Sequence, residues 1–87
     1  MYYVYFLQSI TRNDKIYIGY ASDLKTRLEY HNKGLNTSTK SNRPWRLVFY
    51  EAYAHKDDAR KREDMLKSYP KTLGGLKRRL QKSLKRY

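Results

Sequence analysis

The sequence predicts an α+β fold in which helices pack on a small three-stranded antiparallel sheet. Runs of aromatic and β-branched residues at 2–8, 15–20 and 45–53 predict the strands, and turn-forming residues separate the first two runs. Apolar residues at helical spacing after the second and third runs predict the helices. The expected order is strand, strand, helix, strand, helix, helix.

The first two runs, Tyr2–Gln8 and Lys15–Tyr20, predict a β-hairpin with a rather long loop between them. Successive side chains of a strand point to opposite faces of the sheet. We therefore expect Tyr3, Tyr5 and Leu7 on one face of the first strand and the even-numbered residues on the other.

The first helix is predicted after Ser22 or Asp23, either of which can cap it, and it ends near Lys33 because Gly34 is at a usual stop position. Its apolar stripe should contain three leucines: Leu24, Leu28 and Leu35. The polar segment that follows, Asn36–Arg43, reads as a loop that can contact backbone phosphates.

The third strand follows a proline, and alternation places Trp45, Leu47 and Phe49 on one of its faces. Glu51 falls on the same face, where we expect an ion pair with a nearby Arg or Lys.

A second helix should run from about Asp57 to Ser68 and end before Pro70. A third should run from about Thr72 to Arg86. The apolar stripe of the third helix consists of four leucines: Leu73, Leu76, Leu80 and Leu84.

Length and charge limit the function. A chain of 87 residues suits one small domain, 1–87, without a large internal pocket. Lys and Arg number 20 against 8 acidic residues, and the net charge of +12 favours a polyanionic partner. The absence of cysteine excludes disulfides and thiolate zinc sites, and no apolar stretch is long enough to cross a membrane, so we expect a cytoplasmic protein.

Glu63 is the acidic residue that helical geometry places on an apolar stripe, beside Ala59 and Leu66. A carboxylate there could hold one Mg²⁺ ion, whose other ligands would be water and substrate phosphate. An ion pair with Lys67, four residues later, explains the position equally well.

Arg27 and His31 lie one turn apart beside the stripe of the first helix, so both can reach the same phosphate. A histidine in this position is more often a packed, hydrogen-bonded residue. Strand tyrosines such as Tyr5 and Tyr17 are likewise more often packing residues, unless a nearby cation or metal makes the phenol a usable base.

The segments YVYFLQS and KIYIGYASDLKTRLEYHNKG resemble the GIY-YIG nuclease superfamily. RPWRLVFYEAY and DARKREDMLK are similar to the strand and the glutamate-bearing helix of its short bacterial members, which are related to the nuclease domain of the excision-repair C subunit. The resemblance extends from Tyr2 to about Lys67.

This resemblance implies a metal-dependent endonuclease acting on DNA, in repair or recombination, with RNA as the alternative substrate. It implies that Glu63 binds Mg²⁺ or Mn²⁺, that Arg27 stabilises charge at the phosphate and that Tyr17 activates water as the general base. Tyr5 would support or share the base role, and His31 would be an auxiliary proton carrier or phosphate contact.

Three positions depart from the family pattern. Tyr3 replaces the first glycine, a change that a strand tolerates. Tyr20 stands where many relatives have lysine, so the cation that helps to deprotonate Tyr17 would come from Lys15 or Lys25. The asparagine that often follows the glutamate helix has no counterpart, because no Asn occurs after Asn42.

Basic residues outside these motifs are candidate nucleic-acid contacts. They lie in the loop before the third strand and along the C-terminal helix: Lys40, Arg43, Lys77, Arg78, Lys82 and Lys85. The helix residues could instead serve only to keep a leucine-striped helix soluble. Two other functions stay open: a nucleic-acid-binding module that has lost turnover, and a basic RNA- or ribosome-associated protein without a catalytic site.

Overall fold

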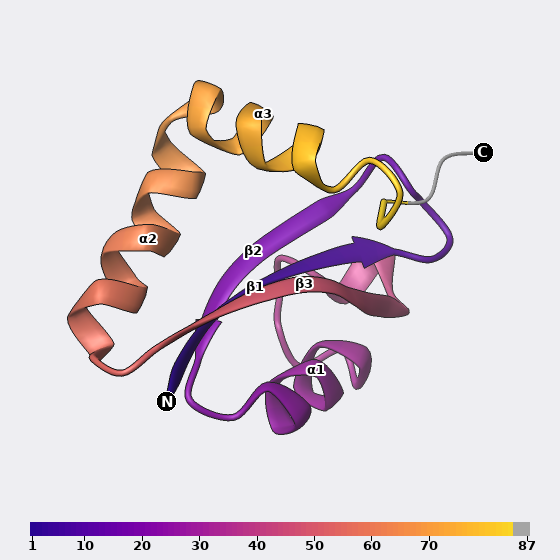
Figure 1. The fold of residues 1–87 in the computed structure, drawn as a ribbon. Coiled ribbons are helices and arrows are strands. Elements are labelled where there is room, and N and C mark those ends of the chain that lie inside the picture. The colour runs from indigo at the N-terminus through magenta and orange to yellow at the C-terminus, as the bar shows by residue number, and fades with distance from the viewer. Residues whose placement is uncertain (85–87) are drawn as a thin grey trace.

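A computed structural model describes residues 1–84 of the chain (Figure 1). Its main elements, in chain order, are β1 Tyr2–Ser9, β2 Ile16–Ala21, α1 Leu24–Asn32, β3 Trp45–Tyr53, α2 Lys56–Ser68 and α3 Pro70–Arg79. A single 3₁₀ turn, Lys40–Asn42, interrupts the loop before β3. The order of the elements and the α+β class agree with the prediction from the sequence.

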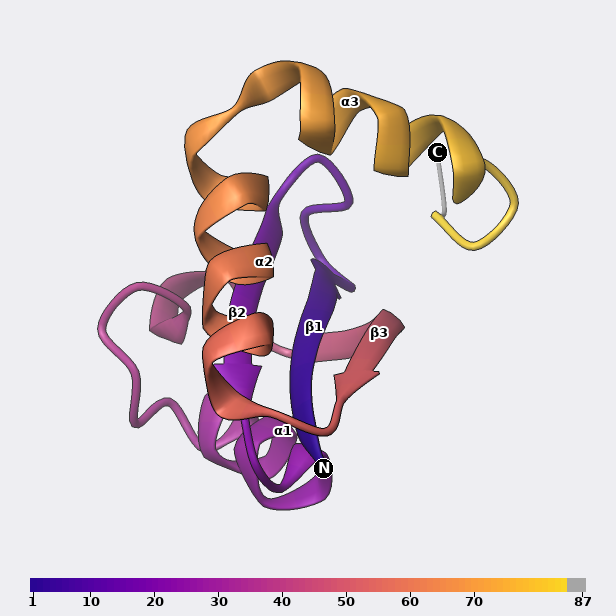
Figure 2. The same ribbon diagram turned by 60° about the vertical axis from the view of Figure 1, so that its left-hand side comes forward.

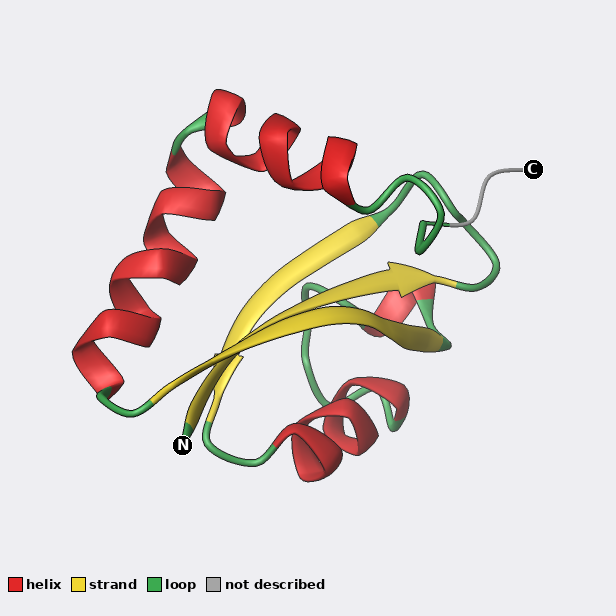
Figure 3. Cartoon of the chain, in the orientation of Figure 1, coloured by secondary structure: helices red, strands yellow, loops and turns green. Residues whose placement is uncertain are grey.

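The three strands form one antiparallel sheet in the order β2-β1-β3, so β2 lies at an edge (Figure 3). In the pairing of β1 with β2, Tyr5 lies opposite Gly19 and Leu7 lies opposite Tyr17. This register places Tyr5 and Tyr17 on the same face of the sheet, as expected for a hairpin with alternating side chains.

The sheet separates two layers of helices, with α1 on one face and α2 and α3 on the other (Figures 1 and 2). Even-numbered residues of β1, Val4 and Phe6, pack with Ala59, Leu66 and Leu76 of α2 and α3. We call this cluster the α2-side core. The odd-numbered residues form a second cluster.

The second cluster, which we call the α1-side core, contains Tyr5 and Leu7 together with Trp45. Leu24 and Leu28 of α1 pack against it. The predicted division of the first strand into two faces is therefore confirmed.

The prediction that Trp45, Leu47, Phe49 and Glu51 share one face is wrong. A bulge interrupts the pairing of β1 with β3, because Phe6 pairs with Phe49 whereas Leu7 pairs with Leu47. The extra residue reverses the alternation, so Leu47 packs on the α1-side core and Phe49 on the α2-side core.

The first helix begins as predicted, since the Asp23 side chain accepts a hydrogen bond of 3.1 Å from the Thr26 backbone N–H. It ends at Asn32, and Gly34 follows with a φ of 75°, in the left-handed region that glycine adopts readily. Leu35 lies beyond this turn and is 62% exposed, so its predicted place on the apolar stripe is wrong.

The last helix is shorter than predicted. It starts at Pro70 and ends at Arg79, whereas the leucine spacing predicts a helix from Thr72 to Arg86. The chain turns after Leu80, Arg46 donates a 2.6 Å hydrogen bond to the Ser83 carbonyl, and Leu84 still packs against the α2-side core. Within residues 1–84, no helix has the length and apolar character needed to span a membrane.

Candidate functional site

The five residues singled out in the sequence gather around the edge strand β2. Tyr5 comes from β1, Tyr17 from β2, Arg27 and His31 from α1, and Glu63 from α2. The first four lie on the α1 face of the sheet, whereas α2 packs on the opposite face and contacts β2. Because β2 has no neighbour on its outer side, side chains from both layers can meet there.

A chain of hydrogen bonds connects Tyr5, His31 and the loop before β3. The Tyr5 hydroxyl lies 2.8 Å from His31 Nε2, and His31 Nδ1 lies 2.8 Å from Thr39 Oγ1. The Arg27 guanidinium lies close enough to the Tyr5 hydroxyl for each group to shift the pKa of the other. A neutral imidazole has one donor and one acceptor nitrogen, so His31 donates to one of its two hydroxyl partners and accepts from the other.

Burial keeps both partners of this chain neutral. His31 is 0% exposed, and desolvation together with the nearby Arg27 charge lowers its pKa from 6.5 to about 4. Burial raises the pKa of the Tyr5 phenol to about 12, although the Arg27 guanidinium favours the phenolate. Tyr5 is therefore a hydrogen-bond donor at neutral pH.

Gly19 makes room for Tyr5. The Tyr5 ring lies across the neighbouring strand, and a Cβ atom at Gly19 would overlap the phenol hydroxyl and ring. Glycine thus has a packing role here that no other residue can fill without moving Tyr5.

Tyr17 is the more accessible of the two tyrosines, half-buried where Tyr5 is 2% exposed. Its ring centroid lies 4.9 Å from that of His31 and 6.3 Å from that of Tyr5. Solvent can therefore reach the Tyr17 phenol while the two buried rings fix its position.

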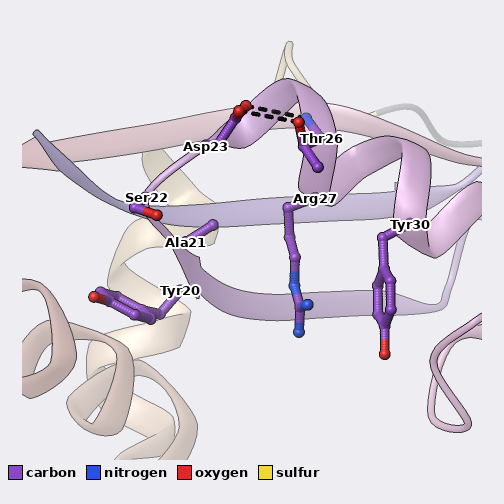
Figure 4. Close-up of a pocket in the computed structure, with 7 residues that line it drawn as sticks. All are labelled: Tyr20, Ala21, Ser22, Asp23, Thr26, Arg27 and Tyr30. Carbon is purple, nitrogen blue, oxygen red and sulfur yellow. Dashed lines mark hydrogen bonds between the residues drawn. The ribbon is translucent and has the colours of Figure 1, made fainter.

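Arg27 lies in a surface pocket with a volume of about 450 Å³ at the junction of β2 and α1 (Figure 4). Its side chain extends between the rings of Tyr20 and Tyr30, and its Cζ atom lies 4.3 Å from the centre of the Tyr30 ring. In the described part of the chain the buried Nε atom has no hydrogen-bond partner. The outer end of the guanidinium extends between the two rings, and an anion such as a phosphate that enters the pocket would meet it there.

Glu63 is half-buried, and its Oε2 atom forms an ion pair of 3.1 Å with Lys67 Nζ. The charge of Glu63 is also close enough to Tyr5 to influence its pKa. The sequence left two explanations open for Glu63, an ion pair with Lys67 and a role as a metal ligand. The ion pair is present, and Glu63 also has the inward position expected of a metal ligand.

The donor set fits a hard cation such as Mg²⁺ better than a soft or borderline one. Among residues 1–84 there is no group of three or more His, Cys, Asp or Glu side chains that could hold a metal. A single carboxylate suits Mg²⁺ or Mn²⁺, which can keep several water ligands and also bind a substrate phosphate.

The predicted competitor, Glu51, has a structural role. Its carboxylate accepts hydrogen bonds of 2.8 and 3.1 Å from Arg62 of α2 and one of 2.6 Å from the Tyr53 hydroxyl. These bonds lower the pKa of Glu51 despite its burial. The expected ion pair is thus confirmed, and it connects β3 to α2.

The candidate nucleic-acid contacts are distributed over two regions of the chain, the loop before β3 and the end of the chain from α3 onwards. Lys40 and Arg43 are exposed on the loop before β3, and Lys77, Arg78 and Lys82 lie on α3 and the turn after it. Lys85 lies outside the described residues.

Four residues at the site were not identified as functional from the sequence. Thr39 is 0% exposed and bonds to His31, and Tyr20 and Tyr30 line the Arg27 pocket. Lys67 was considered only as a partner of Glu63. Its spacing from Glu63 was the one available indication, because the other three contacts depend on the tertiary path of the chain.

Comparisons with known proteins identify the family of the chain. The family model described as the GIY-YIG catalytic domain matches residues 1–81. UPF0213 proteins of Staphylococcus aureus strains Mu3, Mu50 and N315 are each 46% identical over 55 residues, which is 62% of this chain and 67% of the relative. No solved structure matches. The chain belongs to the GIY-YIG family, a family of nuclease domains.

Proposed function

We propose that this chain is a metal-dependent endonuclease that hydrolyses phosphodiester bonds in DNA. The observation that carries the proposal is the meeting of groups from opposite layers at β2. Lys67 Nζ lies 3.1 Å from the Glu63 carboxylate and 5.5 Å from the centre of the Tyr17 ring. A carboxylate for a metal and a phenol for water activation are thus neighbours, and Arg27 interacts electrostatically with the same phenol.

Tyr17 is the proposed general base. A base must reach the water that it deprotonates, and Tyr17 is half-buried whereas Tyr5 is enclosed. The raised pKa of Tyr5 keeps its phenol protonated at neutral pH, so little phenolate is available to accept a proton. Of the two roles expected for Tyr5, we therefore assign the supporting one: it orients Arg27 and His31 through its hydroxyl.

Arg27 is the proposed phosphate ligand. Its guanidinium extends into the pocket, and its Nε atom has no partner within residues 1–84. The interaction with the Tyr5 hydroxyl and the stacking on Tyr30 hold the guanidinium in place before substrate binds. A fixed cation at a developing negative charge stabilises the transition state without reorganisation.

His31 is the proposed positioning residue for Tyr5. Its complete burial leaves no surface for a phosphate, and its lowered pKa keeps it neutral at pH 7. The 2.8 Å bond from His31 Nε2 to the Tyr5 hydroxyl holds the phenol in place. His31 thereby positions the Tyr5 hydroxyl that interacts with the Arg27 guanidinium.

Glu63 is the proposed ligand of one Mg²⁺ or Mn²⁺ ion. When bound, such an ion supplies charge neutralisation at the phosphate and polarises the leaving oxygen. In the proposed reaction the water oxygen forms a new bond to phosphorus, and its proton passes to the Tyr17 phenolate. The bond from phosphorus to one sugar oxygen breaks, and that oxygen takes a proton from solvent.

The net charge of +12 favours binding to any nucleic acid, so charge does not distinguish DNA from RNA. We propose DNA as the substrate and RNA as the alternative. Exposed basic residues of the two candidate regions would contact backbone phosphates, and we propose that the chain acts as one domain over 1–87.

A cleavage assay on the purified chain tests this proposal. Supercoiled plasmid, flap, fork, single-stranded DNA and single-stranded RNA are incubated with Mg²⁺, Mn²⁺ or EDTA, and a Tyr17→Phe preparation controls for contaminating nucleases. We expect cleavage that requires the metal and is strongly reduced in Tyr17→Phe. Binding without cleavage of any substrate would refute the endonuclease and favour a nucleic-acid-binding module.

A further inference from the structure

Lys67 holds two groups of the proposed site at once. Its ammonium pairs with Glu63 at 3.1 Å and lies over the Tyr17 ring, 5.5 Å from the ring centre. Its side chain is 46% exposed and that of Glu63 is 22% exposed, so the lysine approaches the carboxylate from the solvent side. The sequence suggested Lys15 or Lys25 as the cation beside Tyr17, but the described contacts place Lys67 there.

We propose that Lys67 is an exchangeable counter-ion of the site. It neutralises Glu63 while no divalent cation is bound, and it pairs with the Tyr17 phenolate when a divalent cation takes its place on the carboxylate. This inference rests on the proposed function for its second half only. The first half concerns the affinity of the chain for a metal ion, whether or not the chain cleaves DNA.

Simple electrostatics favours the exchange. One carboxylate cannot neutralise an ammonium and a divalent cation together, and the two cations repel each other at the short distances involved. The ammonium is at the end of a flexible four-carbon stem, so it can move while the backbone of α2 stays in place. Tyr17 is an anion, the phenolate, when it takes the proton from water in the proposed reaction, and the ammonium already lies over its ring.

The alternative is an ordinary helix-surface ion pair between residues four apart, which only adds stability to α2. The two explanations predict different effects of removing Lys67 on the affinity for a metal ion. If Lys67 competes with the metal, its removal strengthens metal binding. If Lys67 only supports the local fold, its removal leaves metal binding unchanged or weakens it.

The test compares Lys67→Met with Lys61→Met, which removes an exposed charge from the same helix. Circular dichroism establishes that both variants fold. Binding of Mn²⁺ is measured by the loss of the free-ion EPR signal, which suits weak sites, and Glu63→Gln gives the background. We expect Lys67→Met to bind Mn²⁺ about twofold or more tightly than the wild type, the ratio expected for loss of a competing ion pair of this kind.

The second half is tested by single-turnover cleavage at saturating Mn²⁺. We expect Lys67→Met to be about tenfold or more slower, because the phenolate loses its counter-ion, and Lys67→Arg to recover part of the rate. Tighter metal binding with slower cleavage supports the proposal, and Lys61→Met should show neither change. Unchanged or weaker Mn²⁺ binding by Lys67→Met overturns it.

An unchanged cleavage rate overturns the pairing with Tyr17. If the wild type cleaves nothing, the proposed function fails while the Mn²⁺ titration still decides whether Lys67 competes for Glu63.

Discussion

The buried histidine of the site should make the folded state sensitive to mild acid. His31 is fully enclosed between Tyr5 and Thr39, and its pKa is lowered from 6.5 to about 4. In the unfolded chain it titrates near the ordinary value. Between these two pH values the unfolded state binds a proton that the folded state does not, so the free energy of unfolding falls as the pH falls.

The size of this effect follows from the shift. About 2.5 pH units at about 1.36 kcal/mol per unit give a loss of about 3 kcal/mol between pH 7 and pH 4. Above pH 6.5 the titration of His31 costs the folded state nothing, and the free energy of unfolding falls as the pH decreases from there to about pH 4. A small domain has a total stability of about 5–15 kcal/mol, so the loss should be easy to measure.

Urea unfolding at several pH values between 7 and 4 measures the effect, with His31→Gln as the reference. Glutamine can donate and accept hydrogen bonds but does not titrate. Asp23 and Glu51 also have lowered pKa values, so the stability that they contribute to the folded state is lost in acid as well. The wild type and His31→Gln both contain these two residues, so their contributions cancel in the difference. The stability difference between wild type and His31→Gln should shrink by about 3 kcal/mol, and a difference independent of pH would refute the buried neutral histidine.

Three further predictions concern binding, packing and catalysis. Arg27→Ala should lower the single-turnover cleavage rate by about 10²-fold or more with a smaller loss of DNA affinity, and full recovery by Arg27→Lys would indicate a purely electrostatic role. Gly19→Ala should lower the free energy of unfolding by about 1–3 kcal/mol in urea, because the added methyl meets the ring and hydroxyl of Tyr5; a loss no smaller in a Tyr5→Ala background, which removes both, would contradict this contact. Replacing Lys77, Arg78 and Lys82 together by Glu should weaken DNA binding uniformly and flatten the dependence of log K on log salt. An unchanged slope would place the DNA path on the loop before β3 instead.

Local pattern predicted the order of the elements because each boundary has a strong residue preference, such as Asp23 at the start of α1 and Gly34 at its end. The face of Tyr5 followed from strand alternation and the position of Arg27 beside the apolar stripe from helical spacing. The bulge in the pairing of β1 with β3 was missed because nothing in the nine-residue strand β3 indicates where an extra residue is inserted.

Long-range contacts account for the rest of what the sequence could not predict. The leucine spacing continues through Leu84, so periodicity alone extends α3 past the turn that follows Leu80. Thr39 belongs to a polar loop with no pattern of its own, and its bond to His31 depends on how that loop returns to α1. The position of Lys67 over Tyr17 requires α2 and β2 to be neighbours, which the order of the elements does not specify.

The most direct test of the proposed activity is the single-turnover cleavage rate of Glu63→Gln beside that of Glu51→Gln. Both variants remove the charge of a half-buried carboxylate that is paired with a cation of α2, so they are closely matched. We predict that Glu63→Gln abolishes metal-dependent cleavage and keeps the melting temperature of the wild type. Glu51→Gln should cleave normally where it is folded but melt at a lower temperature. Cleavage by Glu63→Gln at the wild-type rate would contradict the assignment of Glu63 as the metal ligand.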